Sequence, residues 1–218
     1  MLDSQTLAMM AEGTGATLYM TLMSTLFGYI LGLPMGIILV VTAPKGLRPN
    51  QVVYRMLDVI VNITRSIPFL ILMILIMPFT RILVGKTYGT TATIVPLALA
   101  AAPFIARMVE SSLLEVDHGV IEAAQSMGAS LWTIIWKVLL AEARTSLIVG
   151  ATIALGTILG YSAMAGAVGG GGIGNLAIMY GYNRYETGVL IITVVALVVI
   201  VQVGQWIGDK IALKLTRK

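Results

Sequence analysis

Side chains that commonly perform chemistry are scarce in this sequence. Its 218 residues include no cysteine and a single histidine, His118, beside ten acidic residues. Structural and catalytic zinc sites draw mainly on cysteine and histidine, and His118 has no second ligand of either type. We therefore expect no metal site, and we interpret His118, which follows Asp117, as a solvated loop or helix-start residue.

Two stretches resemble nucleotide-binding motifs but lack essential parts. Gly85–Thr87 reads like the end of a phosphate-binding loop, but Thr80 stands where that motif requires a glycine. Gly169, Gly171 and Gly174 satisfy G-x-G-x-x-G, which has meaning only between a strand and a helix. Here they follow an apolar run, and we interpret GAVGGGGIGNL as a flexible loop that packs closely or moves. The sequence thus predicts no cofactor and favours a function other than catalysis.

The composition indicates a protein that spans a membrane. Hydrophobic residues make up 58% of the chain and charged residues 11%, whereas a soluble domain carries about 25% charged residues. The mean hydropathy is +0.94. We expect membrane lipid around the chain and no nucleic acid as a partner.

Five apolar segments are long enough to cross a bilayer as helices, which takes about 20 residues. Four contain a charge-free run of that length, whereas the second reaches it only by including Arg55, Asp58 and Arg65. The sequence predicts an all-α integral membrane protein with one transmembrane domain over about residues 13–211. The expected spans are about 15–42, 54–78, 90–111, 146–167 and 188–208.

The placement of lysine and arginine predicts the orientation, because basic residues concentrate in cytoplasmic loops. The poorer set of loops holds Arg81, Lys86 and Arg184. We therefore expect a multi-pass protein of the cell membrane with its N-terminus outside and its C-terminus in the cytoplasm. The first span has no basic residue before it, unlike a signal peptide, so we expect it to be retained. The richer set holds Lys45, Arg48, Arg55, Arg107, Lys137, Arg144, Lys210, Lys214, Arg217 and Lys218.

The longest predicted cytoplasmic loop contains the patterned segment EAAQSMGASLWTIIWKVLLAEA, which begins at Glu122. Asp117 can cap a short helix over about residues 119–127, and Gly128 suits the left-handed position that ends a helix. Ser130 can cap a second helix that runs to about residue 140. The sequence therefore predicts a helix–glycine–helix elbow between the third and fourth spans.

The first arm of this elbow is expected to expose Glu122, Ala123 and Ala124. Two alanines beside an acid form a narrow ridge that can dock in a groove of another protein. Trp132 and Trp136 lie one turn apart on the second arm and suit the membrane–water interface. On periodicity alone, an amphipathic connector resting on lipid headgroups explains the segment equally well.

The spacing within the elbow resembles the signature loop of ABC-importer permeases. That loop reads E-A-A, three residues, Gly, and then an apolar helix ending in I-x-L-P. This chain has EAA at 122–124, Gly128 and VLLA at 138–141, so Ala141 stands where the family carries proline. In that family the elbow is the coupling helix, which sits in a cleft of the ATPase subunit. The resemblance implies a transport subunit that is not itself an enzyme, with ATP hydrolysed on a partner.

Other stretches are similar to the permeases of methionine importers. The similarity runs from about Gly13 to the C-terminus, and it rests on NITRSIPFLILM, PFTR, PFIARMVE, GYSAMAGAVGGGGIG and YGYNRYET. Polar-amino-acid permeases share the elbow but typically carry R-G-T-P where this chain has RSIP at 65–68. The resemblance implies methionine import, with a polar-amino-acid importer as the alternative.

This resemblance also implies partners. Five spans are few to enclose a solute path, so a twofold dimer with the path on its axis is the economical solution. Two copies would present two elbows to two ABC ATPase subunits, and an extracytoplasmic methionine-binding protein would dock outside. A gradient-driven carrier is a different class of function, but the sequence lacks clear repeats with broken helices and ionisable midplane residues. A structural scaffold would leave the elbow without a purpose.

Polar residues in the second span are candidates for the translocation path. Arg65 costs about 3 kcal/mol if it faces lipid, and Pro68 cannot donate a hydrogen bond to Thr64, so the helix should loosen near Arg65 and Ser66. We expect this break near the path, although Arg65 could instead lie at the cytoplasmic end and pair with Asp58. The sequence does not assign Arg65 as a substrate ligand.

Two further groups complete the candidates within the spans. Tyr161, Ser162 and Met164 lie among small residues that let helices approach closely. A methionine there could plug a narrow passage, and we predict a gate, although core packing explains one methionine equally well. Arg107 and Glu110, at i and i+3, can pair locally in a structural role.

Overall fold

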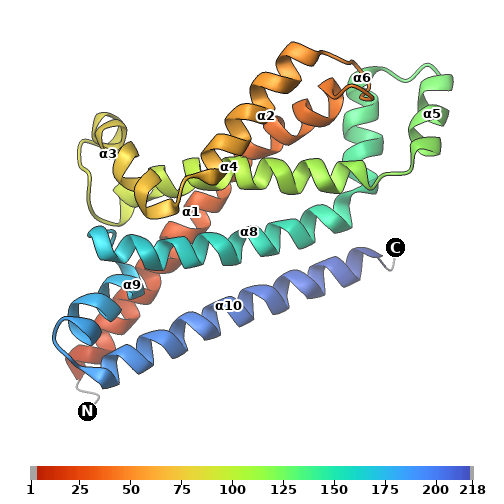
Figure 1. Ribbon diagram of the computed structural model, residues 1–218. Coiled ribbons are helices and arrows are strands. Elements are labelled where there is room, and N and C mark those ends of the chain that lie inside the picture. The colour runs from red at the N-terminus through yellow and green to blue at the C-terminus, as the bar shows by residue number, and fades with distance from the viewer. Residues whose placement is uncertain (1–3, 217–218) are drawn as a thin grey trace.

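Apolar runs of the sequence form long helices in the computed structural model, which describes residues 4–216 (Figure 1). Within those residues there is no strand, and the predicted all-α membrane fold is confirmed. Arg217 and Lys218, two of the basic residues that predict the orientation, lie outside the described residues. Helices long and apolar enough to cross a membrane are α1 (Ser4–Thr42), α4 (Thr90–Leu114), α8 (Arg144–Ala165) and α10 (Thr187–Thr216).

The fifth predicted span is a broken pair of helices. α2 (Gln51–Ser66) and α3 (Phe69–Val84) meet at an angle of 112°. Ile67 and Pro68 between them adopt extended backbone, with ψ of 126° and 136°. Proline disfavours the helical conformation of the residue before it, so the chain leaves the helix at this point. The span expected over about 54–78 is therefore broken into two helices, and the loosening expected at Pro68 is a complete break.

Short elements fill the two longest connections. They form the elbow between α4 and α8, and a glycine-rich turn between α8 and α10. The elbow contains α5 (His118–Ser126), α6 (Leu131–Thr133), the π-helix η1 (Ile134–Leu139) and α7 (Leu140–Glu142). The turn contains the 3₁₀-helix η2 (Gly166–Val168), α9 (Gly172–Leu176) and the π-helix η3 (Ala177–Tyr182).

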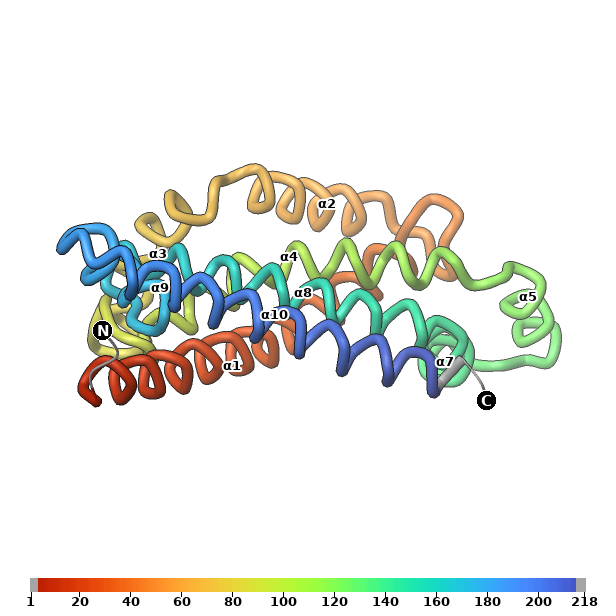
Figure 2. Tube along the Cα trace, turned by 90° about the horizontal axis from the view of Figure 1, so that it is seen from below, coloured from red at the N-terminus to blue at the C-terminus, as the bar shows by residue number. Residues whose placement is uncertain are grey.

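The long helices make an elongated bundle. Figure 2 shows the start of α1, the glycine-rich turn and the start of α10 at one end, with α5 and the end of α10 at the other. α4 lies at the centre, and 72% of its apolar 18-residue stretch is buried. α10 lies at the edge, and only 6% of its corresponding stretch is buried. A single copy therefore leaves most of α10 uncovered by protein.

Glycines on one face of α1 bring it into close contact with α4. Gly28, Gly32 and Gly36 recur every four residues and therefore share one helix face. A Cβ atom at Gly32 would lie 2.6 Å from the carbonyl oxygen of Ala102, and one at Gly36 would lie 2.6 Å from that of Ala106. Small residues of this kind let membrane helices pack backbone to backbone.

The glycine-rich turn packs tightly against its surroundings. A Cβ atom at Gly166 would lie 2.3 Å from the backbone nitrogen of Asn175, and one at Gly174 would lie 2.2 Å from the carbonyl oxygen of Ala163. The Thr17 hydroxyl of α1 accepts a hydrogen bond of 2.8 Å from the Ile173 N–H. Of the two behaviours expected for this loop, the structure thus shows close packing.

We expect Gly36→Ala to destabilise the protein, although alanine favours helix. The added methyl group would clash with the backbone of α4, which cannot shift easily. Overpacking costs about 2 kcal/mol, and for a chain of this size that lowers Tm by about 5 °C. Gly15→Ala is the matched control, because Gly15 lies on the same helix and an added Cβ there would meet nothing within 4 Å. Thermal unfolding in detergent should show Gly15→Ala at or above the parent Tm, since alanine favours helix. Equal Tm values for the two variants would contradict this account of the α1–α4 contact.

Candidate functional site

The elbow is built by local hydrogen bonds at its two helix starts and its turn. The Asp117 carboxylate accepts a hydrogen bond of 2.7 Å from the Gly119 N–H at the start of α5. Gly128 has φ of +75°, and the following residue, Ala129, donates to the carbonyl of Ala124 at 3.0 Å. Ser130 then accepts from the Thr133 N–H at 3.3 Å. Both predicted caps and the left-handed glycine are confirmed.

The second arm of the elbow differs from the predicted α-helix. Its middle is the π-helix η1, in which the Leu140 N–H bonds to the Ile135 carbonyl, five residues earlier. The wider turn brings Ile134 and Leu139, also five residues apart, to the same buried side. Although Ala141 replaces the family's proline, the chain still leaves the helix at Ala143 and turns into α8 (Figure 1).

The exposed ridge of the elbow is narrower than expected. Glu122 and Ala123 are exposed, but Ala124 is only 5% exposed, so the prediction that all three face outward is wrong. Gly128 turns the chain back so that Ile134 and Ile135 of the second arm cover the inner side of α5, and Ala124 packs in their cluster. Ala124 thus ties the first arm to the core.

A cavity of about 470 Å³ separates part of α5 from the rest of the protein. Its lining includes Lys45 from the loop after α1, and His118, Glu122 and Gln125 from α5. His118 is the exposed first residue of α5, as interpreted from the sequence. The elbow is therefore held mainly through Ala124 and the second arm rather than along its whole length.

The polar residues predicted for the path divide into two places. Arg65, Ser66 and Pro68 lie at the break between α2 and α3, and all three are exposed. Arg65 lines a cavity of about 140 Å³ together with Tyr161 of α8, so the structure brings these two predicted residues together. The Ser66 hydroxyl donates to the Asn62 carbonyl of its own helix at 2.8 Å.

The remaining residues of the predicted gate lie elsewhere on α8. Ser162 is 1% exposed, and its hydroxyl donates to the Leu159 carbonyl at 2.7 Å, so it faces the packed interior of this copy. Met164 is 49% exposed. Neither residue lines the cavity at Arg65.

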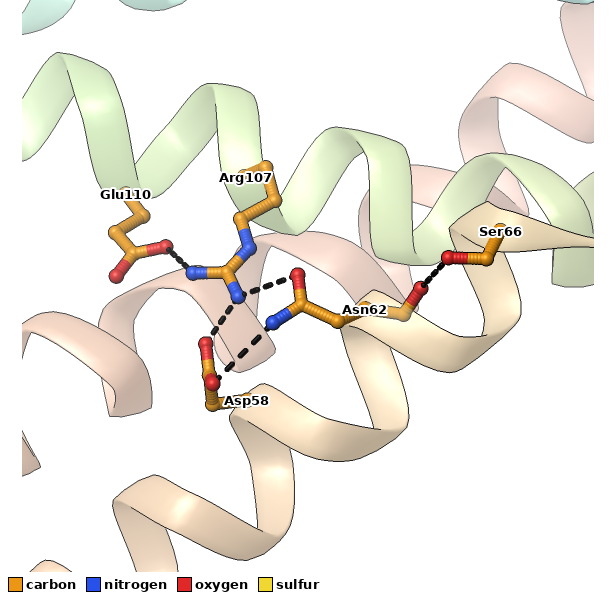
Figure 3. Close-up of polar contacts among 5 residues, drawn as sticks. All are labelled: Asp58, Asn62, Ser66, Arg107 and Glu110. Atoms are coloured by element: carbon orange, nitrogen blue, oxygen red, sulfur yellow. Dashed lines mark hydrogen bonds and ion pairs between the residues drawn. The ribbon is translucent and has the colours of Figure 1, made fainter.

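Asp58 pairs with Arg107, not with Arg65. Figure 3 shows the Arg107 guanidinium between Asp58 and Glu110, with the Asn62 side-chain oxygen as a further acceptor at 2.9 Å. The Glu110 contact is 2.6 Å long and is the local pair expected at i and i+3. The sequence-based alternative that joined Asp58 to Arg65 is therefore wrong.

The ion pair between Asp58 and Arg107 fastens α2 to α4, and it was not predicted from the sequence. Asp58 and Arg107 are 49 residues apart, so no local pattern predicts their contact. One local signal exists, because Asp58 and Asn62 stand at i and i+4 and the Asn62 amide donates to Asp58 at 3.2 Å. That spacing places them on one face of α2.

Comparison with known proteins places these features in a family. Residues 28–217 match the family model described as binding-protein-dependent transport system inner membrane component. The probable D-methionine transport system permease protein MetI of Vibrio cholerae serotype O1 is 51% identical over 201 residues, which are 92% of this chain and 89% of that protein.

Two solved structures are also similar to this chain. A chain of the MetNI methionine ABC transporter, in an inward-facing conformation, matches with a TM-score of 0.97 and 47% identity, covering 98% of this chain and 99% of that one. A chain of an amino acid ABC transporter with histidines has a TM-score of 0.79, 17% identity and coverage of 98% and 99%, which shows a shared fold alone.

The family model spans most of the chain, including the elbow and the cavity at Arg65. The arrangement of spans that the structure shows also matches the MetNI chain over nearly its whole length. This chain belongs to the family of binding-protein-dependent transport system inner membrane components.

Proposed function

We propose that this chain is the permease subunit of an ATP-driven methionine importer. The observation that carries the proposal is the similarity over 98% of the chain, at 47% identity and a TM-score of 0.97, to a chain of the MetNI methionine ABC transporter. The name of the Vibrio cholerae relative supports the same substrate. In this proposal, residues 13–211 form the transmembrane domain, and ATP is hydrolysed on a separate subunit.

Two copies of the chain enclose the translocation path. The support is the uneven burial of the spans. Only 28% of the apolar 18-residue stretch of α8 and 6% of that of α10 are buried. Large faces of both helices are therefore free to contact a second copy and lipid. The proposed path and gate residues are Arg65, Ser66, Pro68, Tyr161, Ser162 and Met164.

The elbow docks on a cytoplasmic ABC ATPase, and a methionine-binding protein docks on the opposite face. This places the N-terminus outside and the C-terminus in the cytoplasm. The support is charge, because Lys45, Lys137 and Arg144 lie on or beside the elbow, and basic residues concentrate on the cytoplasmic side. Figure 1 places the end of α10 near the elbow and the start of α1 at the far end.

The proposed coupling residues are Glu122, Ala123, Ala124 and Gly128. Glu122 and Ala123 form the exposed contact, and Gly128 sets the angle between the arms. Ala124 shares a packed cluster with residues of α1, α4, η1 and α8. A push on α5 would therefore reach the spans through close-packed side chains, which transmit strain because protein interiors compress little.

We expect Gly128→Leu to weaken the hold of the permease on its ATPase. Leucine has room at this position, but the left-handed backbone costs it about 1–2 kcal/mol, so the elbow should lose its angle and binding should fall about tenfold. Copurification of the ATPase with tagged permease measures the effect.

Gly85→Leu provides the matched control for this elbow variant. Gly85 also ends a helix with a left-handed φ of +79° and has nothing within 4 Å of an added Cβ, but it follows α3, away from the elbow. It should cost similar stability and leave ATPase binding unchanged. Undiminished ATPase binding and transport in Gly128→Leu would refute the coupling role.

The transporter should contain two copies of this chain in each assembly. Native mass measurement of the detergent-solubilised complex, or coexpression of two differently tagged copies, tests this. One tag should capture the other from solubilised membranes. An active assembly that holds one copy of this chain beside a different permease would contradict the dimer.

The substrate should be methionine. Labelled methionine should enter cells whose only methionine importer is this permease with its own ATPase and binding protein. Excess unlabelled methionine should compete, in separate tests of the D and L forms, whereas arginine and glutamate should not. Uptake of glutamine or histidine without uptake of methionine would replace this proposal with the polar-amino-acid alternative.

A further inference from the structure

The cavity at the broken span lies near the middle of the bundle. Its lining includes Ala100 and Phe104 of α4. Ala100 comes ten residues after the first residue of α4, Thr90, and Phe104 comes ten before the last, Leu114. The cavity is therefore about equally far from both ends of the central span.

Arg65 is a charged side chain in this central position, and it has no ion-pair partner among residues 4–216. The ion pairs within those residues both use Arg107, which binds Asp58 and Glu110. An arginine at membrane depth is costly, and such residues mark substrate paths when they face a cavity. Because Asp58 and Glu110 both pair with Arg107, the guanidinium of Arg65 is available to an anionic group from outside the chain.

Three aromatic residues line the cavity beside Arg65, together with the aliphatic Ile67, Leu72 and Ala100. Phe69 and Tyr161 stack with ring centroids 4.7 Å apart and an interplanar angle of 2°, and Phe104 contributes a third ring to the lining. Phe69 is buried in a cluster with Met20 and Leu97, which holds the stack in place. Aromatic rings make favourable contacts with a thioether sulfur.

We propose that this cavity is a substrate site within the membrane, which holds a small apolar amino acid by its carboxylate on Arg65 and by its side chain against the aromatic rings. The volume of about 140 Å³ suits such a ligand, since drug-sized ligands take about 300 Å³ or more. A guanidinium binds a carboxylate through paired hydrogen bonds.

The break between α2 and α3 is what opens this site. In a continuous helix, residues 64–69 would form about one and a half turns. Arg65 and Phe69 would then project from the same face of that helix. With extended backbone at Ile67 and Pro68, Arg65 ends one helix and Phe69 begins another at 112° to it. The two side chains can then line the same small space from different directions.

This inference rests on the proposed function, and photolabelling tests it separately. The probe is a diazirine analogue of methionine that keeps the carboxylate and the ammonium group. The complete transporter, with its ATPase and binding protein, is reconstituted in proteoliposomes and irradiated. Mass spectrometry then maps the label on this chain, and uptake of labelled methionine is measured on the same preparation.

We expect label on the segments around residues 64–72, 100–104 or 161. Arg65→Gln should lower this labelling about tenfold, because it removes a charge-assisted contact, and Arg65→Lys should lower it less. Arg81→Gln is the matched control, since Arg81 is an exposed arginine on α3 that does not line the cavity; labelling should change less than about twofold. Excess methionine should block labelling of the wild type, and methioninamide, which lacks the carboxylate, should not.

The outcomes separate the two proposals. Uptake of methionine together with equal labelling in wild type and Arg65→Gln would overturn the site and leave the importer standing. Methioninamide that protects against labelling as well as methionine does would also overturn the site and leave the importer standing. This measurement requires only the wild-type protein. Absence of methionine uptake by the wild-type transporter would overturn the proposed function and this inference with it.

Discussion

The contact between α1 and α4 sets the geometry of the rest of the protein. Where Gly32 and Gly36 face α4, added Cβ atoms would lie 2.6 Å from its carbonyl oxygens, so the two backbones approach as closely as glycine allows. Without a hydrophobic driving force between helices in lipid, such close packing is a main source of association. α4 is thereby held at the centre, where 72% of its apolar 18-residue stretch is buried. The other elements pack around α1 and α4.

The charged groups of α2 and α4 are arranged so that Arg65 stays available. Arg107 of α4 takes both nearby carboxylates, Asp58 and Glu110, and so fastens α2 to the central helix. Removing one partner from a partly buried pair leaves a charge uncompensated, which costs more than the pair itself contributes. Asp58 is thus paired within the chain, and Arg65, two turns further along α2, lines the cavity without an ion-pair partner among residues 4–216.

Both the elbow and the broken span combine an interruption of regular structure with firm anchoring. The elbow projects from the bundle, yet Ala124 and η1 pack in the same cluster as Val109 and Leu113 of α4. The break at Pro68 interrupts a span, yet Phe69 is buried directly after it. In each case the polar or exposed residues lie beside a buried one, so a force or a ligand at these places would bear directly on the core.

Features that depend on near neighbours in the chain could be predicted from the amino-acid sequence. Asp117, Gly128 and Ser130 act on backbone groups within a few residues, and Pro68 acts on the residue before it, so their effects follow from local chemistry. Apolar length likewise predicts the spans, because a helix satisfies its own backbone in lipid. Contacts between distant segments arise only when the helices pack: the partner of Asp58, the stacking of Phe69 on Tyr161, and the burial of Ala124. These depend on which helix faces meet, and helix faces are paired by packing across the whole bundle rather than by any local pattern.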